Sequence, residues 1–205
     1  MSVDQAANDP LLTVRSRAKA SRRQALLTAA ANLFAARGFN GVSIEDLGAA
    51  AGVSGPAVYR HFTGKHAVLA ALLVGVSQDL YDGGKAVVAA SGDGIKALQG
   101  LIEFQVDFAL TNADVIRVQD RELETLPDDD GHNVRALQRQ YVEVWVDVLA
   151  QVHPDTDREL LRMRAHAAFG LINSTPHTTH RRRTAKDVAA LRRILERMAW
   201  AALNC

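Results

Sequence analysis

The chain has 205 residues, 48% of them hydrophobic, so it is long enough for one large domain or two small ones with a sizeable core. Aromatic residues make up only 5% of the chain, which favours helices over strands. The single cysteine is the last residue, Cys205, so an internal disulfide is excluded. The net charge of +1 conceals an uneven distribution of acidic and basic residues along the chain. No apolar run reaches the length of a membrane span, so we expect a cytoplasmic protein without membrane association.

The first third of the chain predicts a disordered tail over residues 1–14 and then four closely spaced helices. These helices are expected over residues 21–38, over residues 43–52, for two turns from residue 54, and from residue 65 towards residue 80 or beyond. Ser43 is an expected N-cap with Asp46 at the third position, and Ser21 is another. Val58 and Phe62 are four residues apart and are expected to face inward.

The remainder also predicts helices, and no alternating strand pattern occurs, so the expected fold class is all-α. Helices are expected over residues 94–111, 113–123, 132–152, 156–175 and 184–203. Asp93, Asp155 and Thr184 are the expected N-caps, the last with Asp187 three residues further on. Residues 127–131 and 175–183 are expected to be loops.

Two short helices joined by a tight glycine turn, as expected over residues 43–62, form a helix-turn-helix, whose second helix can enter the major groove of DNA. Residues 15–65 carry eight basic and two acidic residues, whereas residues 79–131 carry twelve acidic and four basic ones. Nucleic acid is therefore expected at the N-terminal end only.

The candidate DNA contacts lie on the face opposite the inward-facing Val58 and Phe62, and just before and after it. On the second helix and its end they are Ser54, Gly55, Pro56, Ala57, Tyr59, Arg60 and His61. Ser43 and Lys65 are expected to help bind phosphate oxygens. Arg15, Arg17 and Lys19 form a basic N-terminal arm, which either follows a minor groove or phosphates or is a solvated tail, and Arg22 of the first helix is a further candidate.

Four short motifs stand in order without gaps: "LFAARGF" (residues 33–39), "SIEDL" (43–47), "AGVS" (51–54) and "YRHF" (59–62), followed by Lys65. With them, residues 22–72 resemble the DNA-binding domain of TetR-family transcriptional regulators. Many members have a lysine or arginine where this chain has Gly55, and a polar residue near Ala57. Readout of bases by long side chains is therefore expected to be weaker here, and Tyr59, Arg60 and the arm are expected to carry more of it.

The resemblance implies a DNA-binding domain over residues 15–66 and a helical effector-binding and dimerisation domain over residues 67–205. It also implies a homodimeric repressor without enzymatic activity, which binds a near-palindromic operator and is released by a small molecule. No cofactor is expected. His177 and His180 have metal-like spacing but no acidic or cysteine companion, so no metal site is expected either.

A ligand pocket in the second domain would be lined by aromatic or polar residues on otherwise apolar helix faces. The candidates are Phe104, Phe108, Arg117, Tyr141, Trp145, Arg164, His166, Phe169 and Asn173, although each could equally be a core residue with satisfied polar groups. Residues 164–178 resemble those of actinobacterial members linked to lipid or acyl-CoA metabolism. We therefore expect an apolar, acyl-CoA-like effector whose anionic group meets an arginine.

The last two expected helices carry apolar residues on more than one face, which predicts that they pack against a second copy of the chain. The expected interface residues are Leu191, Ile194, Leu195 and Met198. Two alternatives stay open. One is a helical ligand carrier or enzyme with a vestigial DNA-binding domain, although no convincing catalytic set occurs. The other is an architectural DNA binder without an effector, which a filled core without a cavity would favour.

Overall fold

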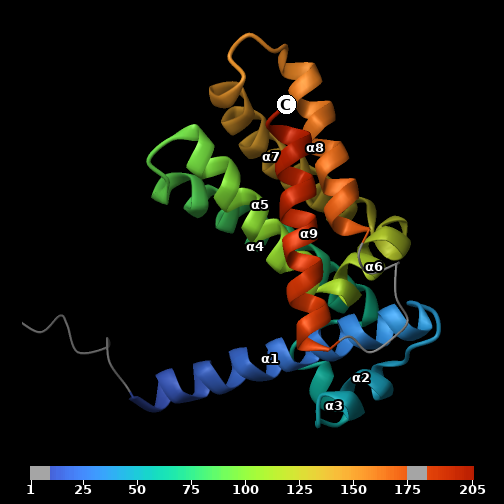
Figure 1. Cartoon of the computed structure of the whole chain (residues 1–205). Coiled ribbons are helices and arrows are strands. Elements are labelled where there is room, and N and C mark those ends of the chain that lie inside the picture. The colour runs from blue at the N-terminus through green and yellow to red at the C-terminus, as the bar shows by residue number, and fades with distance from the viewer. Residues whose placement is uncertain (1–9, 175–183) are drawn as a thin grey trace, which may run out of the picture. The chain divides into compact units, whose positions relative to one another are not determined.

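The computed structural model describes residues 10–174 and 184–205, with side chains from Ser16 onward. The chain divides into two compact units, Met1–Leu72 and Leu73–Cys205, and the long helix α4 (Lys65–Ala90) contains the boundary between them. The described ranges contain helices and no strand, so the all-α prediction is confirmed (Figure 1). None of the described helices combines the length and apolarity that crossing a membrane requires.

The first unit contains α1 (Pro10–Arg37), α2 (Ile44–Ala50), α3 (Gly55–Val58) and the start of α4. Its core is formed by apolar side chains that are at most 6% exposed, among them Leu26, Phe34, Leu47, Val58 and Phe62. Helix α1 begins eleven residues before the predicted N-cap Ser21, so residues 10–14 are helical and the predicted tail is wrong there. The segment that follows is rich in alanine, arginine and lysine, and this strong helix propensity outweighs a capping signal. Residues 1–9 lie outside the described part.

The connection between α2 and α3 depends on a capping box and on glycine. Ser43 is the N-cap of α2, and its hydroxyl accepts a hydrogen bond from the Asp46 N–H at 3.0 Å, as predicted. A Cβ at Gly48 would lie 2.8 Å from the carbonyl oxygen of Val53, so only glycine allows the turn to pack so closely on α2. Gly52 ends the helix with a φ of 69°, a conformation that glycine adopts without strain.

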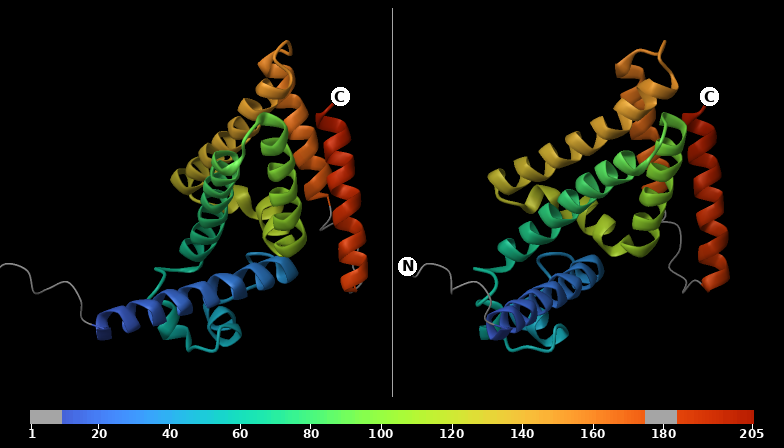
Figure 2. Two further views of the ribbon diagram at one scale, coloured as in Figure 1. Left: turned by 60° about the vertical axis from the view of Figure 1, so that its left-hand side comes forward. Right: turned by 90° about the vertical axis from the view of Figure 1, so that its left-hand side faces the viewer.

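The second unit contains most of α4 and six further elements in its described part: α5 (Gly94–Thr111), α6 (Ala113–Glu122), the 3₁₀ turn η1 (Leu123–Thr125), α7 (Asp128–Val152), α8 (Arg158–Asn173) and α9 (Ala185–Leu203). Helix α9 runs along α5 and α8, and α7 packs on α5 and α8 (Figures 1 and 2). Trp145 is fully buried in the core that these helices share.

Helix ends in this unit follow the predicted caps in part. Asp93 caps α5, and Thr184 forms a capping box with Asp187 at the start of α9, as predicted. The predicted loop over residues 127–131 is wrong, because α7 already begins at Asp128. Three aspartates lie in the first turn of this helix, where the helix dipole favours negative charge. Asp157, not the predicted Asp155, caps α8. The predicted loop over residues 175–183, with His177 and His180, lies outside the described residues.

Candidate functional site

The turn from α2 into α3 presents an outward surface in the first unit. Val58 and Phe62 are buried, as predicted, while Ser54, Pro56, Tyr59 and Arg60 are exposed. Their neighbours Gly55, Ala57 and His61 are half-buried. His61 also turns its Nδ1 into the protein, where no hydrogen-bond partner lies within reach among the described residues. The surface available to a DNA groove is therefore formed mainly by the four exposed side chains, those of Ser54, Pro56, Tyr59 and Arg60.

Lys65 and Ser43, both expected to bind phosphate, have local roles in this structure. The Lys65 ammonium donates hydrogen bonds to the carbonyl oxygens of Phe39 and Val42, each at 2.8 Å, and lies 4.4 Å from the centre of the Phe39 ring. Ser43 is engaged in its capping box with Asp46, whose pKa is lowered mainly by the Ser43 N–H and then by the Ser43 hydroxyl. These contacts hold both side chains locally, and phosphate binding near Ser43 and Lys65 stays a prediction.

The basic residues before the first predicted cap are not a flexible arm. Arg17, Lys19 and Arg22 are exposed side chains on α1, and the side chain of Arg15 lies outside the described part. Arg23, which sequence reasoning left out, places its guanidinium 5.1 Å from the centre of the Phe62 ring. Positive charge in this unit is therefore carried by a regular helix as well as by Arg60.

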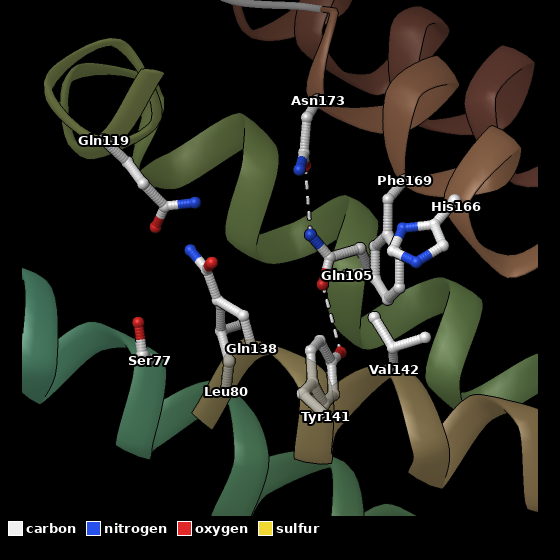
Figure 3. A pocket seen from close by; sticks show the side chains of 10 residues that line it. All are labelled: Ser77, Leu80, Gln105, Gln119, Gln138, Tyr141, Val142, His166, Phe169 and Asn173. Carbon is white, nitrogen blue, oxygen red and sulfur yellow. Dashed lines mark hydrogen bonds between the residues drawn. The ribbon is translucent and has the colours of Figure 1, made fainter. Parts of the chain in front are cut away.

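Helices α4 to α8 line a half-open cavity of ≈ 220 Å³ (Figure 3). Its polar lining comes from Ser77, Gln105, Gln119, Gln138, Tyr141, His166 and Asn173. Its apolar lining comes from Leu80, Val142 and Phe169. Among the described residues, no lysine, arginine, aspartate or glutamate contributes to this lining.

A chain of hydrogen bonds fixes one wall of the cavity. The Tyr141 hydroxyl donates to Gln105 Oε1 at 3.0 Å, and Gln105 Nε2 donates to Asn173 Oδ1 at 3.0 Å (Figure 3). Burial raises the pKa of Tyr141 well above its ordinary value, an effect that the neighbouring Trp145 indole offsets only in part. The phenol therefore stays protonated and remains a donor, and the buried Gln105 amide is held by partners at both ends.

Two adjacent glycines let aromatic rings pack directly on α4. A Cβ at Gly84 would lie 2.5 Å from Cε2 of Tyr141, and a Cβ at Gly83 would overlap the ring of Phe104. The Tyr141 ring then stacks against Phe169, with 5.5 Å between the ring centres. Sequence reasoning missed this feature, although a glycine pair in the middle of a long helix was a visible signal.

Comparison with known protein families matches both units. Residues 26–72 match the model described as "Bacterial regulatory proteins, tetR family", and residues 91–177 match "Tetracyclin repressor-like, C-terminal domain". This chain belongs to the TetR family of DNA-binding regulators. Members of this family are regulators and not enzymes.

Individual relatives and structures agree with this membership. The HTH-type transcriptional repressor KstR2 of Rhodococcus jostii (strain RHA1) is 27% identical over 132 residues. The match covers 64% of this chain and 65% of the relative, which is just under two thirds of the relative's length. KstR2 of Mycobacterium tuberculosis (strain CDC 1551 / Oshkosh) is 29% identical over 150 residues, or 69% and 74%. A TetR-family regulator from Bordetella parapertussis 12822 superposes with a TM-score of 0.76 at 25% identity, covering 86% of this chain and 93% of its own. AibR, solved with isovaleryl coenzyme A and operator DNA, superposes with a TM-score of 0.70 at 17% identity, covering 89% and 98%.

In this TetR-family chain, the cavity brings together four of the predicted ligand residues: Tyr141, His166, Phe169 and Asn173. Phe104 and Phe108 instead line a second hollow of ≈ 250 Å³ beside Asp79 and Asp107, and Trp145 is buried in the core. Sequence reasoning missed the remaining lining residues: Ser77, Leu80, Gln105, Gln119, Gln138 and Val142. For Gln105 a signal existed, since this amide interrupts the apolar stripe formed by Ile102, Val106 and Ala109.

The structure brings neither predicted arginine to the cavity lining. Arg117 forms an ion pair with Asp114 on the same helix, at 2.7 Å. Arg164 donates a hydrogen bond to the main-chain oxygen of Cys205 at 2.9 Å. Both guanidiniums thus remain near acceptors at the protein surface, where a cation avoids the cost of burial.

The predicted dimer residues separate into two groups. Leu195 is only 4% exposed and belongs to the core of the unit, and Leu191 is partly buried against the same core. Ile194 and Met198 are about half exposed on α9. Helix α8, which packs along α9, adds two exposed apolar side chains, Leu160 and Met163.

Proposed function

We propose that this regulator is a transcriptional repressor that a small molecule releases from operator DNA. The observation that carries this proposal is the continuity of α4, which begins at Lys65 in the helix-turn-helix unit and supplies Ser77 and Leu80 to the cavity of the second unit. A ligand that fits the cavity in only one conformation of the chain would shift the equilibrium between conformations that bind DNA well and poorly. The KstR2 relatives, which are named repressors, favour repression over activation.

The repressor is proposed to act as a homodimer that presents two recognition helices about one DNA turn apart to a near-palindromic site. The exposed apolar side chains Leu160, Met163, Ile194 and Met198 of α8 and α9 support a second copy as the partner of this face. Met198→Glu should give a folded monomer in analytical ultracentrifugation at micromolar concentration. The buried Leu195 offers the contrast, because Leu195→Glu should unfold the second unit instead. A Met198→Glu variant that stays dimeric would place the interface elsewhere.

The cavity also bears on the alternatives. An architectural DNA binder without an effector was expected to have a filled core, whereas this chain has a half-open cavity of ≈ 220 Å³ lined by hydrogen-bonding groups. That volume is below the ≈ 300–1,000 Å³ of common ligand sites, so it is too small for coenzyme A and could take only the acyl end of an acyl thioester. AibR, with its isovaleryl coenzyme A, supports such an effector only through a shared fold.

DNA binding is tested by selecting genomic fragments on the pure protein and sequencing those that are retained. A shared near-palindromic motif is expected, and random recovery would contradict the proposal. On such a fragment, Arg60→Ala should weaken binding by about 1–3 kcal/mol if Arg60 reads a base, with the loss concentrated at one base pair. Tyr59→Phe should weaken binding equally across sequences, because it removes a phosphate contact. The exposed Arg139 of α7 supplies the control, since Arg139→Ala should bind DNA normally.

A further inference from the structure

The cavity described above is polar without being charged. Four of its lining residues carry a carboxamide: Gln105, Gln119, Gln138 and Asn173. A carboxylate or ammonium placed there would lose its hydration and would meet no ion of opposite charge among the described lining residues. The chemistry of this wall therefore disfavours ionic ligands and favours ligands with uncharged hydrogen-bonding groups.

Two of the four carboxamides are available to a ligand. Gln105 is engaged at both ends by Tyr141 and Asn173, at 3.0 Å each. Gln119 of α6 and Gln138 of α7 form no such bonds with the described residues, and Figure 3 shows their amides pointing toward one another at one end of the cavity. Each amide offers two N–H donors and a carbonyl acceptor. Both side chains are half-buried, so a ligand competes with water for them, and one that satisfies both kinds of group gains most.

We propose that the cavity binds a small uncharged amide, with its carbonyl and N–H groups on Gln119 and Gln138. An amide presents a donor and an acceptor side by side, as these side chains do, whereas a ketone or an ester presents only acceptors. The apolar part of the ligand lies against the Phe169 ring, with Leu80 and Val142 around it. This inference rests on the proposed function only in treating the cavity as the effector site.

The volume sets the size of the ligand. A space of ≈ 220 Å³ lies below the ≈ 300–1,000 Å³ of common ligand sites and favours a small ligand. A single substituted ring such as benzamide is of this order and joins a planar amide to an apolar face. Benzoate and benzylammonium have nearly the same shape but carry a negative or a positive charge, and toluene lacks the polar group. These four compounds form a matched series that separates charge from hydrogen bonding.

The test is calorimetric titration of the full chain with each compound at pH 8, above the range in which histidine usually takes up a proton, because His166 also contributes to the lining. Benzamide should bind with a Kd of about 10 mM or tighter, a modest affinity for so small a ligand. Benzoate and benzylammonium should bind at least tenfold more weakly than benzamide. Equal or tighter binding of either ion, or no saturation by benzamide, would overturn the proposal.

Variants locate the bound amide. Gln119→Leu and Gln138→Leu should each weaken benzamide at least fivefold while leaving toluene binding equal or stronger, which shows that the cavity remains folded. Gln99→Leu, at an exposed glutamine of α5 outside the lining, should leave both ligands unchanged. If either cavity variant unfolds, the corresponding Gln→Glu variant replaces it and should weaken benzamide by placing a charge at the same position. Benzamide binding that none of these variants changes would overturn the assignment.

Operator binding, measured separately, keeps the two proposals distinguishable. Benzamide bound through Gln119 and Gln138 would uphold the ligand class whatever its effect on DNA. A loss of DNA affinity well below twofold, when free benzamide equals its Kd, would count against the effector role. Normal operator binding and release by another compound, without benzamide binding, would uphold the repressor and overturn the ligand class.

Discussion

Replacing Gly84 with alanine would place a Cβ 2.5 Å from Cε2 of Tyr141, closer than packed carbon atoms approach. Either the Tyr141 ring or α4 must then move. The ring has little room, because it is 5% exposed, packs on Phe169 and Trp145, and donates its hydroxyl hydrogen bond to Gln105. The cost of the extra methyl group should therefore appear as lost stability of the second unit and a distorted cavity wall.

The size of the effect follows from three contributions. Alanine in place of glycine inside a helix stabilises by about 1 kcal/mol. Overpacking a well-filled core by one methyl group costs about 1–3 kcal/mol. Loss of the Tyr141–Gln105 hydrogen bond adds about 1 kcal/mol. Gly84→Ala should therefore destabilise the protein by about 1–3 kcal/mol, which lowers Tm by very roughly 2–12 °C in a chain of this size.

Gly75 of the same helix provides a matched control. A Cβ at Gly75 meets nothing within 4 Å, so Gly75→Ala should show the helix-propensity gain alone, up to about 1 kcal/mol of added stability. Urea unfolding of both variants and the parent at one fixed protomer concentration measures the difference and avoids the concentration dependence of a dimer. If Gly84→Ala is as stable as Gly75→Ala, the close packing of Tyr141 on α4 is wrong.

Three further substitutions test individual contacts. Lys65→Met removes both hydrogen bonds to the carbonyls after α1 and should lower the free energy of unfolding in urea by about 1–3 kcal/mol. In the same variant, the slope of log K for DNA binding against log[salt] should change by less than one unit. Arg162 and then Arg158 lower the pKa of Glu143. The ionised Glu143 therefore stabilises the fold above the ordinary glutamate pKa, and this stabilisation is lost as the pH falls through the lowered pKa. Glu143→Gln should reduce the dependence of Tm on pH in acid, and an unchanged profile would contradict this account. Arg164→Ala should leave ligand binding within twofold of normal in calorimetry, because its partner is a main-chain carbonyl outside the cavity lining.

Helix positions could be predicted where the signal was local. The caps at Asp93 and Thr184 depend on residues three positions apart, and both are confirmed. The start of α1 could not be placed at Ser21, because a run of good helix formers continues through that position and a serine there can remain inside a helix. The motifs of residues 33–62 predicted the helix-turn-helix and its inward-facing Val58 and Phe62 correctly.

The cavity was harder to predict because residues from five helices meet there. Tyr141, Phe169 and Asn173 of α7 and α8 were picked out because they interrupt apolar faces, and all three line the cavity. The partner of Arg164 could not be foreseen, because the carbonyl of Cys205 lies 41 residues away in the chain and becomes an acceptor only once α8 and α9 pack together. An arginine near apolar residues in the sequence therefore did not indicate a place in the cavity lining here.

The size of the cavity also limits how strongly an effector can act on DNA binding. A ligand that binds only the released conformation weakens operator affinity by a factor of 1 + [L]/Kd, so a hundredfold release requires free ligand at about 100 times its Kd. At a Kd of about 10 mM, benzamide cannot reach that ratio, and it should bind the cavity while releasing little DNA. We therefore expect the natural effector to bind at least a hundredfold more tightly and to form further hydrogen bonds. The Asn173 amide N–H groups are available as donors, and the Ser77 oxygen, whose proton is donated to the Leu73 carbonyl, is available as an acceptor. The effector concentration that releases half of the bound DNA should lie above the effector's Kd for the free protein. Asn173→Leu should move this concentration and the Kd in the same direction.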